Sequence, residues 1–381
     1  KDAFLDNNEY ERQRGITIFS KQACFKYKEL DVTLLDTPGH VDFSAEMERT
    51  LWVLDYAVLV ISGMDGVQGH TDTLWRLLKR LNVPVFMDQQ GTNRQRLLEQ
   101  LKNKLSSGCV DFTGCMSGAE PDYEEIATCS EAALEEYLDT SEVSDESISC
   151  MLDERDIFPV IFGSALKLNG VEELLGIMNR FCTQKSYGDE LSAKVYKISR
   201  DDRGERLTHI KVTGGVIKSK CIINDEKVNQ IRVYSGDKFT AIQEAPAGSI
   251  CALTGLAGTY AGQAIGEGIE DNSPVLTPVL NYKINLPAGI DPMQMLPKLR
   301  AVGEEEPQLH IEWNENFKEI HVQVMGPVMI EVLQNIIKER FGIDVTFGEG
   351  SIVYKETITN KVEGIGHFEP LRHYAEVHLI L

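Results

Sequence analysis

The stretch that decides the fold reads Arg14-Gly15-Ile16-Thr17-Ile18, then a β pattern, then Asp36-Thr37-Pro38-Gly39-His40. Residues 32–35, Val-Thr-Leu-Leu, are apolar and partly β-branched, which predicts a buried strand that ends in Asp36 and a Pro-Gly turn. Ligands of open α/β folds bind at the carboxyl ends of the strands. We therefore expect Asp36 to lie at a ligand-binding edge of a sheet.

The residues after this turn predict a helix. Asp42 can cap it, and its apolar positions recur at helical spacing: Phe43, Met47, Leu51 and Leu54. The N–H of Gly39 then lies in a strand-to-helix turn, where a backbone donor can meet a terminal phosphate.

Composition limits the classes of function. The chain has 381 residues, which predicts two or three domains. Lys plus Arg number 38 against 59 Asp plus Glu, so the net charge is −21. A chain this acidic is not a general polyanion binder, because neutralising phosphates requires clustered cations. Any contact with RNA must be local, or made by segments outside this sequence.

Cysteine usage and hydropathy indicate an intracellular protein. The eight cysteines contain no Cys-x-x-Cys pair, which predicts free buried thiols in a reducing cytoplasm. No apolar run approaches the roughly 18 residues of a membrane helix, and no signal peptide is recognisable. We therefore expect a soluble protein.

The first half of the chain predicts an α/β unit. A buried strand at 57–61, a helix through Leu74 to Leu81 and a strand at 83–86 form a βαβ unit with a parallel sheet. Asp88 follows the last of these strands. A further strand at 158–162 leads to Gly163-Ser164-Ala165 and a helix at 171–181. Charged helices at 94–106 and 120–137 are interpreted as solvated faces, and residues 1–13 as a loop.

The sequence pattern changes in the second half of the chain. From Ala193 many short alternating runs separated by turn residues predict a β-barrel, with the glycine-rich run 255–268 at its corners. After a linker at 274–278, the order β-α-β-β-α-β predicts a split βαβ sandwich. Residues 364–377 are expected to be a strand of a further domain. His367 and His373 do not suggest a metal site, because no third ligand has ordinary spacing.

Two motifs together resemble a known family. Arg-Gly-Ile-Thr-Ile at 14–18 and Asp-Thr-Pro-Gly-His at 36–40 resemble switch I and switch II of the translational GTPases, the family of elongation factor G. The alternative is a hairpin and turn that carry these residues by chance. Ser164 and Ala165 match the base-contact motif of that family, and Asp88 fits the last position of its Asn-Lys-x-Asp motif. The Asn-Lys step is missing, so we expect residues to be absent before Met87.

The resemblance implies roles for these residues. Thr17 and Asp36 would bind Mg²⁺, Gly39 would donate its N–H to the γ-phosphate, and His40 would orient the attacking water. Asp88, Ser164 and Ala165 would contact guanine, completing a set of GTP-binding residues with Thr17, Asp36 and Gly39. His40 can alternatively be a surface histidine, and Arg14 either contacts phosphate or forms a salt bridge. The Gly-x-x-x-x-Gly-Lys-[Ser/Thr] phosphate loop does not occur in the 381 residues, so the chain as written is expected to bind GTP poorly.

The expected fold class is therefore multidomain. It comprises an α/β P-loop-type GTPase domain with a parallel sheet (1–188), a β-barrel domain (189–273), an α+β split βαβ, ferredoxin-like domain (274–357) and the start of a further domain (358–381).

The resemblance implies a ribosome-dependent GTPase with GTP and Mg²⁺ as cofactors. Met325-Gly326-Pro327 stands where elongation factor G typically reads Gly-Glu-Leu-His, which favours the tetracycline-resistance ribosomal protection proteins. A translocase or a release-factor GTPase is an alternative, as is a ribosome-binding module that does not hydrolyse GTP. The expected partners are ribosomal RNA, ribosomal proteins and GTP or GDP, with no membrane. We expect a cytoplasmic monomer.

Overall fold

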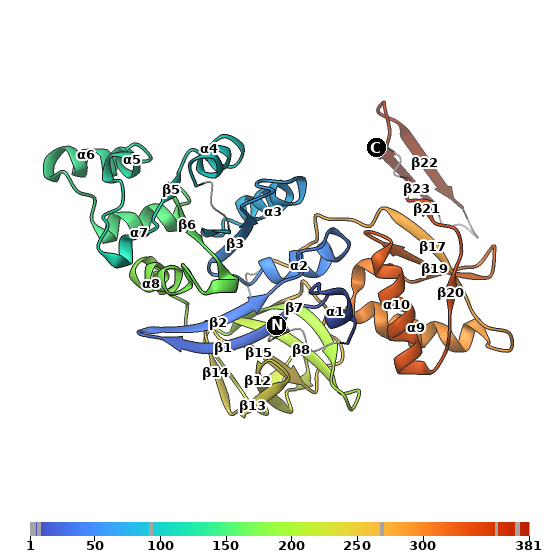
Figure 1. Ribbon diagram of the computed structural model, residues 1–381. Helices are drawn as coiled ribbons and strands as arrows, with labels where there is room; N and C mark the ends of the chain where they lie inside the picture. The colour runs from blue at the N-terminus through green and yellow to red at the C-terminus, as the bar shows by residue number, and fades with distance from the viewer. Residues whose placement is uncertain are drawn as a thin grey trace.

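The computed structural model describes residues 5, 9–90, 94–266, 270–354, 357–369 and 374–380. Figure 1 shows three bodies in chain order: an α/β unit, a β unit beneath it, and an α+β unit beside both. The expected multidomain fold class is confirmed.

A four-stranded parallel sheet forms the centre of the α/β unit. Its strands stand in the order β3-β4-β6-β5, and they are β3 Ala57–Ser62, β4 Val85–Gln90, β6 Phe158–Gly163 and β5 Cys109–Asp111. Helix α3 (Gly69–Arg80) makes the crossover from β3 to β4, as the sequence predicts. Strand β3, at the edge of the sheet, is buried on one face only, because Val58 and Val60 are exposed.

Helices cover both faces of this sheet. On one face Trp75 and Leu78 of α3 pack with Leu97 and Leu101 of α4, and on the other face Phe86 packs among α7 and α8. The helices after α3 are α4 Arg94–Lys104, η2 Cys115–Ser117, α5 Tyr123–Ala127, α6 Glu131–Thr140, α7 Asp145–Asp153, η3 Ala165–Lys167 and α8 Val171–Phe181. The helix predicted at 171–181 is confirmed. The single helix predicted at 120–137 is wrong, because Asp122 and Ser130 begin two separate helices.

The segment expected to be a buried strand is half of an exposed hairpin. Strand β1 (Lys21–Tyr27) pairs antiparallel with β2 (Leu30–Asp36) in a two-stranded sheet, separate from the parallel sheet. Leu34 is 45% exposed. The buried-strand prediction is therefore wrong, because the alternating apolar residues of β2 meet only one neighbouring strand among the described residues. The loop predicted for residues 1–13 is wrong over residues 9–13, since α1 spans Glu9–Arg14; residues 1–4 and 6–8 lie outside the described residues.

The helix after the turn begins later than predicted. A 3₁₀ turn, η1 (Val41–Phe43), precedes α2 (Ser44–Leu51). Every residue of α2 is buried, including Glu46, Glu48 and Arg49. This helix therefore lies at the junction of the three bodies, where Figure 1 places it.

The β unit is antiparallel throughout. Its main sheet has the order β13-β12-β15-β8-β7-β16, and two short pairs, β9 with β14 and β10 with β11, complete it. The strands are β7 Ser192–Arg200, β8 Arg206–Gly214, β9 Val216–Lys218, β10 Ile222–Ile223, β11 Glu226–Lys227, β12 Gln230–Ser235, β13 Lys238–Ile242, β14 Glu244–Pro246, β15 Ile250–Thr254 and β16 Ala264–Ile265. Gly255, Gly262 and Gly266 have positive φ, as expected for glycines at corners; Gly268 lies outside the described residues.

The α+β unit has the predicted order β-α-β-β-α-β. Its sheet runs β18-β19-β17-β20 with all pairs antiparallel, and β21 also pairs with β17. The elements are β17 Leu280–Asn285, α9 Pro292–Glu305, η4 Pro307–Leu309, β18 Glu312–Asn314, β19 Glu319–Val324, α10 Val328–Phe341, β20 Thr346–Phe347 and β21 Ser351–Ile352. Leu299, Val322 and Leu333 fill the core between the two helices and the sheet.

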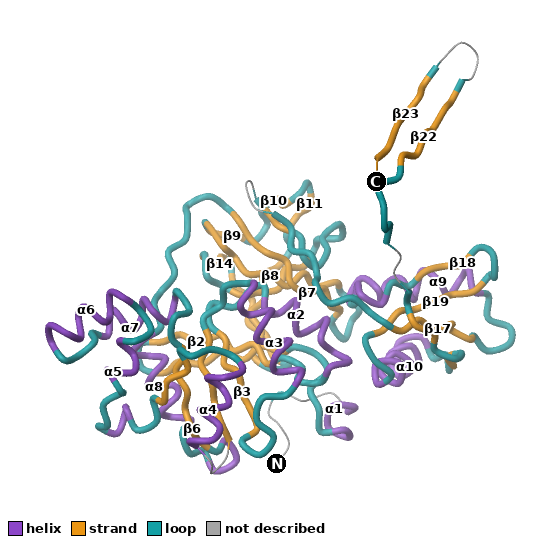
Figure 2. The backbone as a smooth tube through the Cα atoms, turned by 90° about the horizontal axis from the view of Figure 1, so that it is seen from above, coloured by secondary structure: helices purple, strands orange, loops and turns teal. Residues whose placement is uncertain are grey.

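The last described segment is a hairpin of β22 (Glu363–Phe368) and β23 (Ala375–Ile380). All of its strand residues are exposed, and Figure 2 shows it standing away from the other units. The sequence predicts one strand here, and the structure has two. His367 contacts Glu376, while His373 lies outside the described residues.

All eight cysteines are free, but Cys24 and Cys150 are exposed, so the expectation that the thiols are buried holds only in part. Among the described residues, no group of three or more His, Cys, Asp or Glu side chains could hold a metal ion. Within the same ranges, no helix is both long enough and apolar enough to cross a membrane.

Candidate functional site

The β1–β2 hairpin brings the two motif segments to one end of a ladder. Lys21, the first residue of β1, pairs with Asp36, the last residue of β2. Thr17 lies four residues before Lys21, while Gly39 and His40 lie three and four residues after Asp36. The two segments are therefore neighbours in space because of the antiparallel register, and not through the parallel sheet that the sequence suggests for Asp36.

Carboxylates hold the backbone that follows Thr17. Glu11 of α1 accepts hydrogen bonds from the N–H of Ile18 at 2.9 Å and of Phe19 at 3.1 Å. Glu46 of α2 accepts from the N–H of Ser20, also at 2.9 Å. Ile18 is 1% exposed and packs into the core of the α+β unit. The segment after Thr17 is thus fixed from both sides.

The donor set at this end suits a metal–phosphate group. A threonine hydroxyl and a carboxylate are oxygen ligands of the kind that Mg²⁺ prefers, and Thr17 and Asp36 are both only partly buried. Gly39 is exposed, and a Cβ built on it would meet nothing within 4 Å. Within the described ranges, its N–H donates no hydrogen bond. The residues present therefore fit an anionic ligand with a bound hard cation.

His40 lies beside this turn with its ring partly solvated. Its side chain is 42% exposed, and its Nδ1 lies 3.2 Å from the backbone N of Asp42 and 3.4 Å from Asp42 Oδ1. Its ring centroid lies 5.9 Å from that of Phe43. His40 caps η1, which means that the predicted cap of the following helix is wrong: Asp42 lies inside η1 and turns its carboxylate to Val328 of α10.

Arg14 forms an ion pair with Glu331 of α10. This ion pair agrees with the salt-bridge interpretation of Arg14. The pair also joins α1 to the α+β unit, on the side of the hairpin where Thr17 lies.

The residues predicted to contact a base lie at the parallel sheet. Asp88 is inside β4 and pairs with Ile161, whereas Ser164 follows Gly163 at the end of β6. The prediction that the strand ends before Met87 is wrong, because β4 continues to Gln90. Asp88 thus lies three residues short of Ser164 along the strand direction, roughly 10 Å at the usual rise. Burial raises the pKa of Asp88.

A tight loop holds Ser164 and Ala165. The N–H of Ser164 donates to Asn169 O at 2.8 Å, and the N–H of Asn169 returns a bond to Ser164 O at 3.1 Å. A Cβ on Gly163 would approach within 3.2 Å of Gly170 Cα and would collide with the carbonyl of Asn169. Ala165 is exposed at the start of η3. Two glycines therefore permit the loop to close behind Ser164.

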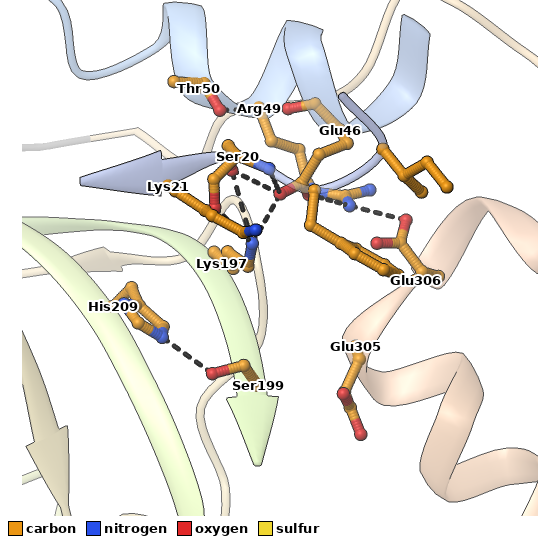
Figure 3. Close-up of polar contacts among 12 residues, drawn as sticks. Ser20, Lys21, Glu46, Arg49, Thr50, Lys197, Ser199, His209, Glu305 and Glu306 are labelled. Atoms are coloured by element: carbon orange, nitrogen blue, oxygen red, sulfur yellow. Dashed lines mark hydrogen bonds and ion pairs between the residues drawn. The ribbon is translucent and has the colours of Figure 1, made fainter. Parts of the chain in front are cut away.

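A buried cluster of charges joins the motif segments to the other two units (Figure 3). Glu46 Oε1 accepts from Lys197 Nζ of β7 at 2.6 Å and from Ser20. Glu46 Oε2 accepts from Arg49 at 2.6 Å, and the same guanidinium nitrogen lies 2.6 Å from Glu306 at the start of η4. We call Ser20, Glu46, Arg49, Lys197 and Glu306 the junction cluster.

The junction cluster balances two carboxylates with two cations. Burial alone would raise the pKa of Glu46, but Lys197 and Arg49 together lower it below its ordinary value. Burial raises the pKa of Glu306. Since an unpaired buried charge is costly, each of these groups depends on the others. The cluster fixes α2, and hence the turn at Gly39 and His40, against the β unit and the α+β unit.

Sequence reasoning missed this cluster and the contact between Asp42 and α10. Glu46 and Arg49 lie three residues apart on α2, but their partners are 151 and 257 residues away. Charged residues within an amphipathic pattern usually indicate a solvated face, and no local signal shows that this helix is buried all round.

Comparison with known proteins adds to this geometry. Residues 1–184 match the family described as the elongation factor Tu GTP binding domain, and residues 275–349 match elongation factor G, domain III. The chain is 31% identical to the tetracycline resistance protein TetP of Clostridium perfringens, over 92% of this chain and 59% of TetP. It is 26% identical to elongation factor G 2 of Syntrophus aciditrophicus (strain SB), over 100% of this chain and 69% of that protein.

A crystal structure of a protein from Thermus thermophilus has the same fold, with a TM-score of 0.79 over 99% of this chain and 66% of that one. The sequences are 20% identical, so this likeness shows the fold alone. The chain spans less than two thirds of the length of TetP. The matched domains, their order and the named relatives agree with the two motifs, and the chain belongs to the translational GTPase family of elongation factor G and TetP.

Proposed function

We propose that the protein is a ribosome-dependent GTPase that acts in translation. The observation that carries this proposal is the β1–β2 register, which brings the segment of Thr17 and the segment of Gly39 and His40 to one end of the hairpin. A phosphoryl-transfer enzyme mainly positions groups and stabilises charge, so two such segments held together are what the chemistry requires.

Each residue has a part in this proposal. Thr17 and Asp36 hold Mg²⁺, whose charge offsets that of the phosphates. Gly39 donates its N–H to the γ-phosphate, and its lack of a side chain leaves room for that group. His40 orients the attacking water; its partly solvated ring can reach such a molecule, and imidazole offers two distinct nitrogens.

Asp88, Ser164 and Ala165 form the proposed guanine contact at the carboxyl edge of the sheet. The Ser164 loop is closed tightly and supports the proposal. The position of Asp88 inside β4 weakens it, because Asp88 pairs with Ile161, three residues before Ser164. We propose that residues 1–381 alone, which do not contain a Gly-x-x-x-x-Gly-Lys-[Ser/Thr] loop, bind GTP poorly.

The domain bounds proposed are 1–188, 189–273, 274–357 and 358–381. The family matches at 1–184 and 275–349 fall inside the first and third of these. The protein is proposed to act as a cytoplasmic monomer on ribosomal RNA and proteins, with GTP and GDP as its other ligands.

Within the family, we propose the ribosomal protection type that confers tetracycline resistance. Met325-Gly326-Pro327 before α10 and the 31% identity to TetP support this choice. An elongation factor G-like translocase or a release-factor GTPase is the second candidate, since relatives named elongation factor G match at 26–27%. A ribosome-binding module without hydrolysis is the candidate of another class.

The test is GTP turnover by the product of the complete gene, with and without ribosomes, beside His40→Ala. Turnover that requires ribosomes and collapses in the variant supports the proposal. No turnover under either condition rejects it in favour of the binding module. In-vitro translation with tetracycline then separates the subtypes: rescue by the protein favours ribosomal protection, and unrelieved inhibition favours the second candidate.

A further inference from the structure

The residue two positions after His40 caps a helix of a different unit. Asp42 is 8% exposed, and its Oδ2 accepts a hydrogen bond of 2.6 Å from the N–H of Val328, the first residue of α10. Pro327, at the N-cap position of α10, has no side-chain cap of its own. A carboxylate at a helix N-terminus satisfies an otherwise unpaired donor and interacts well with the helix dipole. Asp42 thus supplies the missing cap across 286 residues of sequence.

Gly326 makes this contact possible. A Cβ built on Gly326 would overlap the carboxylate of Asp42. Its φ lies outside the left-handed region, so the backbone conformation does not demand glycine here. The reason for glycine is space for the side chain that arrives from the turn at His40.

The other oxygen of the same carboxylate faces His40. His40 Nδ1 lies 3.4 Å from Asp42 Oδ1 and 3.2 Å from the Asp42 backbone N. These two neighbours favour different tautomers of a neutral ring. The backbone N–H requires an unprotonated Nδ1 as its acceptor, which places the proton on Nε2; the carboxylate favours a proton on Nδ1, which leaves Nε2 free to accept from water.

We propose that Asp42 is a positioning residue for His40. The Asp42 carboxylate sets which ring nitrogen of His40 carries the proton. The hydrogen bond from the N–H of Val328 in α10 to Asp42 Oδ2 sets where that carboxylate lies. The α+β unit is thereby connected to the imidazole through one side chain. The consequence for catalysis rests on the GTPase function proposed above, whereas the connection between α10 and the tautomer does not.

The test uses the product of the complete gene labelled with ¹⁵N at histidine, with His40 assigned by its absence from His40→Ala. Asp42→Asn removes the carboxylate charge and keeps its shape. Gly326→Ala displaces the carboxylate from a site 284 positions along the chain, by the numbering of the two residues. Gly303→Ala in α9 is the matched control, because its Cβ would come no closer than 3.8 Å to Ile311, an ordinary contact.

We expect Asp42→Asn and Gly326→Ala each to change the His40 tautomer ratio about tenfold, the scale of one charge-assisted hydrogen bond. Gly303→Ala should keep the wild-type ratio. Asp42→Asn and Gly326→Ala should both lower kcat for ribosome-stimulated GTP turnover with KM for GTP unchanged, since neither position is among the proposed GTP-binding residues.

The outcomes are distinguishable. Wild-type tautomer ratios in both Asp42→Asn and Gly326→Ala overturn the proposal. A changed ratio in Asp42→Asn alone, with Gly326→Ala equal to Gly303→Ala, overturns the connection to α10. If the wild-type protein turns over no GTP, the proposed function fails, and the tautomer ratios still decide this inference.

Discussion

Lys197 Nζ of β7 lies 2.6 Å from Glu46 Oε1 of α2, in an ion pair whose side chains are 13% and 4% exposed. The pair connects the β unit to the helix that follows the turn at His40. Breaking a buried ion pair from one side leaves an uncompensated charge and typically costs about 3–5 kcal/mol, whereas an exposed pair contributes about 0–1 kcal/mol.

We therefore predict that Lys197→Met lowers the thermal unfolding midpoint by several degrees. The matched control is Lys218→Met, which removes a cation paired with Glu244 where both side chains are more than half exposed. Scanning calorimetry of the two variants beside wild type makes the comparison. Equal midpoints in Lys197→Met and Lys218→Met would show that the junction cluster does not hold the units together.

His209 should make stability depend on pH. It lies partly buried in β8, with Ser199 Oγ 2.8 Å from its Nε2, and burial together with the nearby Lys197 charge lowers its pKa to about 3. The unfolded chain has a histidine pKa near 6.5, so as pH falls the unfolded state binds the proton first. Stability is full above about pH 6.5 and is lost progressively toward pH 3, by roughly 1–2 kcal/mol at pH 5.

The measurement is the unfolding midpoint at pH 7 and pH 5 for wild type and His209→Gln. Glutamine does not titrate, so its two midpoints should differ less than those of wild type. His310→Gln, at an exposed histidine, is the control and should keep the wild-type difference. A wild-type difference that persists in His209→Gln would assign the pH dependence to other groups.

The local hydrophobic pattern of the sequence was sufficient to predict an element whose conformation depends mainly on its own residues. Helix α8 spans 171–181 as predicted, since apolar residues recur at helical spacing after Gly170. The order of the α+β unit was also predictable, because strands β17 and β19 and helices α9 and α10 are long enough to show their own period. Strand β2 shows the limit: Leu34 looks like a core residue, and only the pairing of β2 shows that it is exposed.

The sequence was sufficient to predict which residues belong to the candidate site, but not how they are arranged in space. Gly39 and His40 were found from their motif, yet their support by Glu46 depends on Lys197, Arg49 and Glu306 meeting around one helix. Such long-range pairs leave no periodic signal. The contact of Asp42 also leaves no local signal. Asp42 was predicted to cap the helix that follows it, but its carboxylate accepts from Val328 at the N-terminus of α10, where Pro327 provides no side-chain cap.

Gly163→Ala should disturb the proposed base-contact loop. The added Cβ would meet the carbonyl of Asn169 and crowd Gly170, so Ser164 must move. We expect a lower unfolding midpoint and at least a roughly tenfold weaker affinity for guanine nucleotides, measured by fluorescent GDP titration of the complete gene product. Gly188→Ala is the control, because its Cβ would meet nothing within 4 Å. Unchanged affinity in Gly163→Ala would remove Ser164 and Ala165 from the proposed site.

Gly39→Ala separates function from folding. Gly39 is exposed, its φ is outside the left-handed region, and its Cβ would enter open space, so the unfolding midpoint should stay at the wild-type value. If its N–H meets the γ-phosphate, a methyl group there competes with the ligand, and ribosome-stimulated GTP turnover should fall by roughly tenfold or more. Gly69→Ala has the same exposure and the same open space at the start of α3, and should retain full turnover. Equal turnover in the two variants would mean that the γ-phosphate does not approach Gly39. The proposed roles of Asp36 and His40 would then lose their support, because both require the phosphate at this turn.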